Sequence, residues 1–317
     1  MDSDKLKEMK NVVEDYYLSG LKQSEIAKKN NLSKSKVSRL INEAKEKGYV
    51  EIKFKFPHEG DEELSNELKA ALGLKHVFVS KFEKSDDKML QNVAEGLIDY
   101  LDRILEEGQI VGVSWGKTMH SISKRLSPIT ERGLKVVQLH GGISNTITDT
   151  RSSDIVRNFG KVLKSDWYTL PVPSIVDNSF IAQTFREDST IKSIFKMIAE
   201  LEVAIFSVGT MNDNELGVKA GYFTPGQFNQ LRIEGFVGDI CSRYYKKNGE
   251  HSTGEIYNRI MGVSLEELAN KKEKICLAFE ERKARSIVSA VQGKYINTLF
   301  TDQATAIEIL KLLTNDN

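Results

Sequence analysis

Short apolar segments alternate with longer helical segments over residues 76–313, and this rhythm constrains the fold more than any other feature of the sequence. Consecutive parallel strands need a helical crossover between them, so the rhythm predicts an α/β domain with a largely parallel sheet covered by helices. The strands are expected at residues 76–80, 109–114, 134–140, 203–208, 274–279 and 296–300, and the helices at 87–106, 117–126, 152–164, 224–235, 281–292 and 302–313.

The first 57 residues follow a different pattern, with short amphipathic helices expected at residues 5–18, 23–30 and 34–47. Ser33 suits the N-cap of the third helix, and Gly48 suits its end. Residues 49–56 alternate between apolar and polar types and predict a strand that Pro57 ends. Three helices and a strand in this order are typical of a winged helix-turn-helix. The apolar faces of the helices contain Met9, Val12, Val13, Tyr16, Tyr17, Ile26, Ala27, Val37, Leu40, Ile41 and Ala44.

The chain has 317 residues, which is more than one ordinary domain of roughly 100–200 residues contains. A polar, acidic segment at residues 58–63 begins where the N-terminal pattern ends, so it is a suitable linker. We therefore expect one domain at residues 1–57 and a second at residues 58–317.

The charge distribution separates these two parts. The whole chain has a formal net charge of zero, but residues 1–57 contain 12 Lys and 1 Arg against 9 Asp and Glu. A local basic excess is typical of a surface that binds DNA phosphates, although a helix bundle with a merely solvated polar face has the same composition. Arg39 suits either a guanine or a phosphate contact. The expected DNA-binding residues are Gln23, Ser33, Lys34, Ser35, Lys36, Ser38 and Arg39.

Several classes of protein are not expected from the composition. No apolar run approaches the roughly 20 residues that span a bilayer, and the first ten residues are charged where a secretory signal would be apolar. Cys241 and Cys276 form no CxxC motif, and the histidines are not clustered, so neither a disulfide framework nor a metal site is predicted. We expect a cytoplasmic protein with two buried thiols and no cofactor.

Three glycine-containing turns follow predicted strands. They are VGVSWGKT at residues 111–118, QLHGG at 138–142 and VGT at 208–210. Because the carboxyl ends of parallel strands meet at one edge of a sheet, where phosphates and other ligands bind, we expect the turns to converge on a ligand. Asp239 suits a sugar hydroxyl, and Lys283 suits a phosphate. The other candidate binding residues are Ser114, Trp115, Gly116, Lys117, Thr118, His140, Gly141, Gly142, Gly209 and Thr210.

Each of these residues also has a purely structural interpretation. A glycine at such a turn relieves steric crowding, and His140 is interpretable as a partly buried histidine whose hydrogen bonds are satisfied. Asp239 is also a candidate capping residue, and Lys283 a candidate solvated charge on a helix.

Ordered sequence blocks over nearly the whole chain resemble the SorC/DeoR family of bacterial sugar-operon regulators, in particular its deoxyribonucleoside-regulator branch. The resemblance implies a winged helix-turn-helix followed by a Rossmann-like, doubly wound effector domain related to phosphosugar isomerases and deaminases. It also implies operator DNA and a sugar phosphate as partners, assembly as a tetramer, and the glycine turns, Asp239 and Lys283 as effector contacts. The matching blocks are QSEIAKKNNLSKSKVSRLI, GVSWGKTM, VVQLHGGIS, LPVP, FSVGT, GYFTP, VGDICSRYY, NRIMGVSLEEL and GKYINTLFTDQATAIEIL.

Two positions depart from the family pattern. Phe279 and Glu280 stand where the family usually has Gly-Gly before its lysine, which alters the expected phosphate contact at that turn. His140 stands where the deoxyribose-phosphate branch has a lysine, and an imidazole cannot form a Schiff base with an aldehyde. We therefore expect a non-covalently bound effector, either a ring-closed or polyol phosphate or an unphosphorylated sugar.

The sequence favours a transcriptional regulator, either a repressor or an activator, of a carbohydrate or nucleoside catabolic operon, with no enzyme activity. The alternative is an isomerase-like or deaminase-like enzyme with a DNA-binding appendage, which would need an acid/base set where only His140 and Asp239 are candidates. A constitutive DNA-binding protein with a vestigial effector domain is a third possibility. One small helix-turn-helix needs a partner on a neighbouring half-site, so we expect a homodimer or homotetramer.

Overall fold

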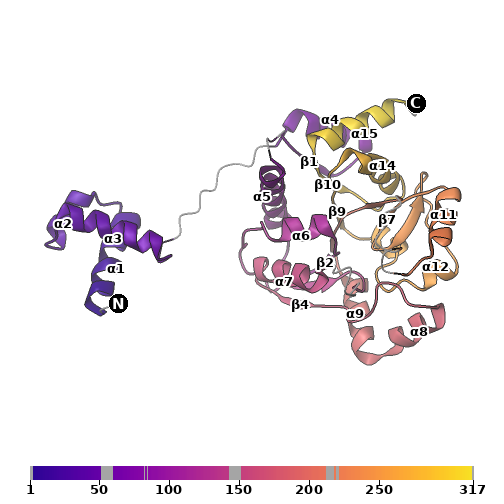
Figure 1. Ribbon diagram of the computed structural model, residues 1–317, viewed down its shortest axis with the longest axis horizontal. Helices are drawn as coiled ribbons and strands as arrows, with labels where there is room; N and C mark the ends of the chain where they lie inside the picture. Colours follow the sequence, from indigo (N-terminus) through magenta and orange to yellow (C-terminus); the bar gives the residue numbers. More distant parts are fainter. Residues whose placement is uncertain are drawn as a thin grey trace. The chain divides into compact units, whose positions relative to one another are not determined.

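The computed structural model describes residues 3–50, 60–81, 83, 85–142, 151–211, 218 and 221–315. The chain divides into two compact units, residues 1–57 and residues 58–317 (Figure 1). None of the described helices is both long enough and apolar enough to span a membrane.

The N-terminal unit is a bundle of three helices, α1 (Ser3–Tyr17), α2 (Gln23–Lys29) and α3 (Lys34–Glu46). The Ser33 hydroxyl accepts a hydrogen bond from the Lys36 backbone N–H at 3.2 Å, which caps α3 as expected. The buried core of the bundle consists of apolar residues that the helical spacing had placed inward. Of the strand predicted at residues 49–56, only Tyr49 and Val50 belong to the described residues.

The second unit contains a seven-stranded, wholly parallel sheet. The alternating pattern predicted a largely parallel sheet and six of these strands, but not the strand at Asp166–Tyr168. The chain passes outward from β2 to β3 and β4 on one side, and from β5 to β9 and β10 on the other. A reversal of strand order of this kind creates a ligand-binding position between β2 and β5 at their carboxyl ends. The strand order is β1 (His76–Ser80), β10 (Thr298–Asp302), β9 (Glu273–Leu277), β5 (Val203–Phe206), β2 (Ile110–Val113), β3 (Lys135–Gln138) and β4 (Asp166–Tyr168).

Helices cover both faces of this sheet (Figure 1). Successive strand residues point to opposite faces, and accordingly Val136 belongs to one buried cluster and Val137 to the other. The first cluster includes residues of α5 (Asp86–Ile104), α6 (Lys117–Ser123) and α7 (Ser152–Val162). The second includes residues of α4 (Glu62–Leu72), α9 (Ser189–Glu200), α14 (Ala284–Gln292) and α15 (Gln303–Asn315). The domain is therefore doubly wound.

A small antiparallel sheet, which the sequence pattern did not predict, is formed by β6 (Gly209–Thr210), β7 (Phe236–Ile240) and β8 (Arg243–Lys246). Cys241 and Ser242 form the two-residue turn between β7 and β8, with φ of 52° and 66°. Two-residue turns with positive φ at both positions usually contain Asn-Gly. Because this turn contains Cys-Ser, the sequence did not indicate a hairpin. The other helices are α8 (Ser179–Glu187), α11 (Pro225–Ile233), α12 (Glu255–Asn258), α13 (Leu265–Ala269) and the 3-10 helix η1 (Glu281–Lys283).

Candidate functional site

Lys283, Thr118 and Ser207 come together at the carboxyl ends of β9, β2 and β5. The Lys283 ammonium group donates hydrogen bonds to the Thr118 hydroxyl at 3.5 Å and to the Ser207 hydroxyl at 3.4 Å. Thr118 lies on α6, directly after the turn that follows β2, whereas Ser207 is the first residue after β5. The convergence of the strand ends thus places a lysine beside two hydroxyl groups at the switch point of the sheet.

Lys283 is buried, with 9% of its surface exposed. The interpretation of Lys283 as a solvated helix charge is therefore wrong. Desolvation by burial lowers the pKa of Lys283. Among the described residues, the ammonium group donates two long hydrogen bonds to hydroxyl oxygens, which are weaker partners than a buried cation normally has. An oxygen-rich or anionic ligand would supply what this group lacks.

His140 and Trp115, which follow the neighbouring strands β3 and β2, form a stacked pair with ring centroids 4.6 Å apart. The Trp115 indole N–H donates to the Gly141 carbonyl at 2.7 Å, which fixes the plane of the ring. Burial of His140 lowers its pKa to about 3, with a smaller contribution from the Arg243 guanidinium group. His140 is therefore neutral at physiological pH.

Contacts through Ser174 and Ser242 connect His140 to Asp239. The Ser174 hydroxyl lies 3.5 Å from His140 Nδ1 and 3.1 Å from the Ser242 hydroxyl. The Ser242 backbone N–H in turn donates to the Asp239 carboxylate at 3.1 Å. Asp239 therefore does cap a turn, as its structural interpretation proposed, and the same turn connects it with the histidine.

Asp239 also lies against β6. A side-chain carbon on Gly209 would be 1.9 Å from Asp239 Oδ1, so the glycine is required for this close approach. Burial raises the pKa of the Asp239 carboxyl group to about 6, although the Ser242 N–H and Lys283 act in the opposite direction. Lys283 and Asp239 thus influence each other electrostatically, as expected for members of one site.

Two buried polar atoms at this edge of the sheet, the Ser114 hydroxyl and His140 Nε2, have no hydrogen-bond partner among the residues that the structure describes. The two residues are 3% and 2% exposed. Their position at the ends of β2 and β3 is where the sequence predicted a ligand. Unsatisfied buried polar atoms are costly, so a ligand with hydroxyl groups would stabilise both.

The remaining predicted residues surround this arrangement. Gly116 is the N-cap residue of α6, with φ of 140°, a conformation that favours glycine, and no described atom would contact a side-chain carbon placed on it. Lys117 is exposed next to it. Gly141 packs against the carbonyl groups of residues 172 and 173, and Gly142 forms a bridge to Pro173. Thr210 pairs with Gly238 in the small sheet.

Sequence reasoning missed Ser174, Ser207 and Ser242. Ser207 lies near the carboxyl end of the strand predicted at residues 203–208, so the sequence offered a signal for its position. Ser174 and Ser242 lie in segments for which we expected neither a helix nor a strand, and the tertiary fold alone brings them to His140. Together these groups offer hydroxyls, a neutral imidazole, a carboxyl and one ammonium, which suit a polyhydroxylated ligand.

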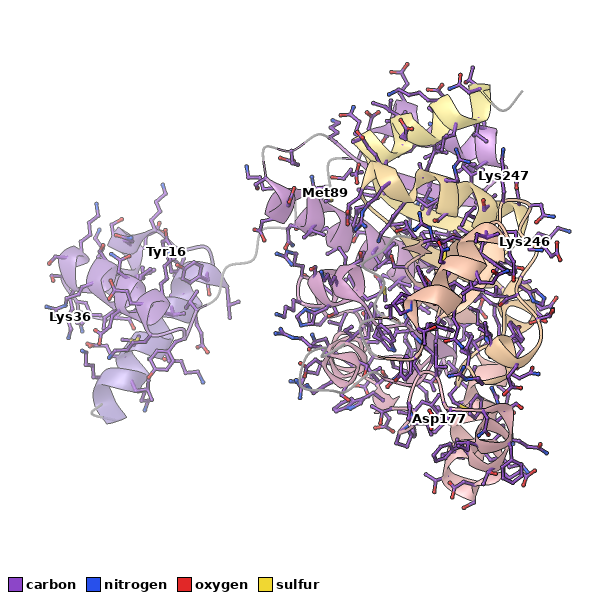
Figure 2. All side chains as sticks on the ribbon, turned by 45° about the vertical axis from the view of Figure 1, so that its right-hand side comes forward. Tyr16, Lys36, Met89, Asp177, Lys246 and Lys247 are labelled. Atoms are coloured by element: carbon purple, nitrogen blue, oxygen red, sulfur yellow. The ribbon has the colours of Figure 1, made fainter. Side chains whose placement is uncertain are left out.

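The predicted DNA-binding residues occupy the turn and the exposed side of α3, apart from Gln23 at the start of α2. Lys34 and Arg39 are exposed, and no described residue forms an ion pair with either. Lys36 lies on the surface of the N-terminal unit (Figure 2), where its ammonium group pairs with the Glu8 carboxylate of α1 at 2.8 Å. Besides capping α3, the Ser33 hydroxyl is 3.0 Å from that of Ser35, while Ser38 is half-buried.

Comparisons with known proteins agree with this architecture. The family model described as "Putative sugar-binding domain" matches residues 57–311. The deoxyribonucleoside regulator of Bacillus subtilis is 36% identical over 303 residues, which cover 95% of each chain. The transcriptional regulator LsrR of Escherichia coli is 27% identical, over 93% of this chain and 92% of that one.

The crystal structure of the full-length sorbitol operon regulator SorC from Klebsiella pneumoniae superimposes with a TM-score of 0.75 and 26% identity. It covers 99% of both chains. These relatives are named as transcriptional regulators and not as enzymes. The chain therefore belongs to the SorC/DeoR family of transcriptional regulators.

Proposed function

We propose that this regulator binds operator DNA through its N-terminal unit and a sugar or sugar phosphate at the edge formed by β2, β3, β5 and β9. The observation that carries the effector part is the buried Lys283 ammonium group, which makes two long hydroxyl contacts within the described part of the chain. The effector binds non-covalently, because the residue at the end of β3 is a neutral histidine, which offers hydrogen bonds rather than an amine.

A thermal-shift screen of the full chain against free sugars and sugar phosphates tests the effector part. A ligand at 100 times its dissociation constant stabilises the folded state by about 2.7 kcal/mol, which raises the melting temperature by several degrees in a domain of this size. The Thr118→Val variant removes one hydroxyl contact of Lys283 and should weaken the shift. If no sugar or sugar phosphate stabilises the protein, the effector assignment is wrong.

The DNA-binding part is supported by the exposed residues of α3 and by the basic excess of residues 1–57. Selection of binding sequences from a random DNA pool should enrich a palindromic pair of half-sites. Enrichment of a single, unrepeated site would contradict a symmetric complex. Failure to enrich any sequence would contradict specific binding.

Effector binding alters DNA affinity in this proposal, and the protein acts as a homodimer or homotetramer that represses its operon. An effector changes DNA affinity only if it binds more tightly to one of two conformations of the protein that differ in DNA affinity. The coupling energy between the two sites is typically about 1–3 kcal/mol. Titration calorimetry of the effector with and without operator DNA measures this coupling. Sedimentation equilibrium of the full chain gives the number of subunits, and a monomer at micromolar concentration would contradict the assembly.

A further inference from the structure

Glu280 has an unusual backbone conformation close to the carboxyl end of β9. It lies between β9 and η1 with φ of 84° and ψ of 123°, a combination that residues with a side chain rarely adopt. The Glu280 N–H donates to the Asp302 carboxylate at 3.1 Å, and its carbonyl accepts from the Lys283 N–H at 2.9 Å. These bonds hold the conformation, and strain of this kind is often found at ligand sites.

The side chain of Glu280 is placed among cations. Its carboxylate accepts a hydrogen bond from the Arg282 guanidinium group at 2.6 Å. The Arg282 contact is the main reason that the pKa of Glu280 is lowered, and the charges of Lys283 and Lys117 act in the same direction. Lys117 follows β2, and Lys283 follows β9. The carboxylate therefore lies in the field of the cations that an anionic ligand would need.

Burial is the main influence on Lys283 and lowers its pKa, and Glu280 and Asp239 both act on it in the opposite direction as negative charges. A phosphate group that approached Lys283 would be repelled by the negative charges of Glu280 and Asp239. To pair with Arg282 as well, the phosphate would have to displace the Glu280 carboxylate from its hydrogen bond with the Arg282 guanidinium group. A ligand hydroxyl carries no net charge, so the carboxylates do not repel it in this way.

We propose that Glu280 is a built-in anion that competes with phosphate for these cations, so that the site selects an uncharged polyhydroxylated effector over its phosphate ester. This inference rests on the proposed function, because it concerns the ligand class of the same site. In this proposal Glu280 acts through its charge. A glutamine at this position would keep the shape of the side chain but would no longer compete with phosphate for the cations.

Inorganic phosphate is the simplest probe of this competition. Its dissociation constant is measured by titration calorimetry with the full-length wild type, Glu280→Gln and Glu281→Gln at constant ionic strength. Glu281 is the matched control, because it is an exposed carboxylate in the adjacent position. We expect phosphate to bind Glu280→Gln at least 10-fold more tightly than the wild type, whereas Glu281→Gln should match the wild type. Equal affinity in the wild type and Glu280→Gln, or the same gain in Glu281→Gln, would overturn the proposal.

Two further measurements make the result unambiguous. Glu280→Gly also removes the carboxylate and suits the positive φ, so it should gain phosphate affinity as Glu280→Gln does, even if the glutamine variant folds poorly. Tighter binding of a sugar phosphate than of the same free sugar by the wild type would overturn the specificity proposal and leave the proposed function intact. Binding of no sugar by any variant would overturn the proposed function, while the phosphate titration still decides the role of Glu280.

Discussion

His140 stacks on Trp115 with 20° between the ring planes, and the contact joins the segments that follow two neighbouring strands of the sheet. The indole N–H is engaged by the Gly141 carbonyl, and the imidazole is buried and neutral. Among the described residues, neither ring nitrogen of His140 has a strong partner, because Nδ1 has a 3.5 Å contact with the Ser174 hydroxyl and Nε2 has none. The imidazole of this pair therefore has hydrogen-bonding capacity that no described residue uses in full.

Lys283→Met should abolish or strongly weaken effector binding without destabilising the protein. Methionine fills much of the same volume and removes the desolvation cost of a buried charge. Lys274→Met is the matched control, since Lys274 is also 9% exposed but lies at the other end of β9, where it donates to the Ala269 carbonyl. Calorimetry with the effector found by screening measures both variants. Unchanged affinity in Lys283→Met would exclude this lysine from the site.

Asp239→Asn should change how stability depends on pH. The folded-state pKa of about 6 exceeds the ordinary value of 3.8, so the protonated form is favoured by folding. The contribution of Asp239 to the free energy of unfolding of the wild type is fully present below about pH 4 and is lost as the pH rises towards 6. Asparagine resembles the protonated form, so the variant should become more stable than the wild type by about 1–3 kcal/mol over this range.

Urea unfolding followed by tryptophan fluorescence measures this difference. The two tryptophans, Trp115 and Trp167, both lie in the second unit, so the fluorescence reports on that unit alone. A constant difference between variant and wild type from pH 4 to pH 7 would contradict the raised pKa.

Borohydride treatment in the presence of aldehyde sugars should trap no adduct on the wild type. A Schiff base requires an accessible, unprotonated amine, and the residue at the end of β3 is His140. His140→Lys would place an amine there and serves as the comparison for trapping. A wild-type adduct mapped by mass spectrometry to Lys117 or Lys283 would contradict non-covalent binding.

Glu8→Gln should strengthen DNA binding, because Glu8 pairs with Lys36 and must release it before the lysine contacts a phosphate. Lys36→Ala should weaken binding to all sequences and reduce the slope of the salt dependence by about one. In the Lys36→Ala background, Glu8→Gln should have no effect. Glu14→Gln is the control, because Glu14 pairs with Lys10 on the same helix at 3.7 Å. A similar gain from Glu14→Gln would indicate a general charge effect.

Arg39→Ala tests direct reading of a base. If the exposed guanidinium group contacts a guanine, its loss should cost about 1–3 kcal/mol and relax the preference at that position. Fluorescence anisotropy with operator variants that differ at single base pairs measures both effects. A uniform loss over all variants would instead assign Arg39 to a phosphate, and an unchanged affinity would exclude it from the interface.

The sequence by itself determined the elements whose formation is local. Helical spacing predicted the buried faces of α1, α2 and α3, and the alternation of apolar and helical segments predicted the parallel sheet. It also indicated the edge at which Thr118, His140 and Lys283 lie, because parallel strands necessarily share their carboxyl ends. The departure at Glu280 was visible in the sequence, but its cation partners were not.

Only the tertiary structure decided the relationships that span long distances along the chain. The small sheet pairs Gly209 with Asp239, and no local periodicity reports such a contact. Burial of Lys283, the contacts through Ser174 and Ser242, and the pairing of Glu8 with Lys36 likewise arise from packing between separate elements. Spacing along a chain encodes which face of an element is apolar, whereas the charge and hydrogen-bond partners of a side chain depend on the elements that pack against it.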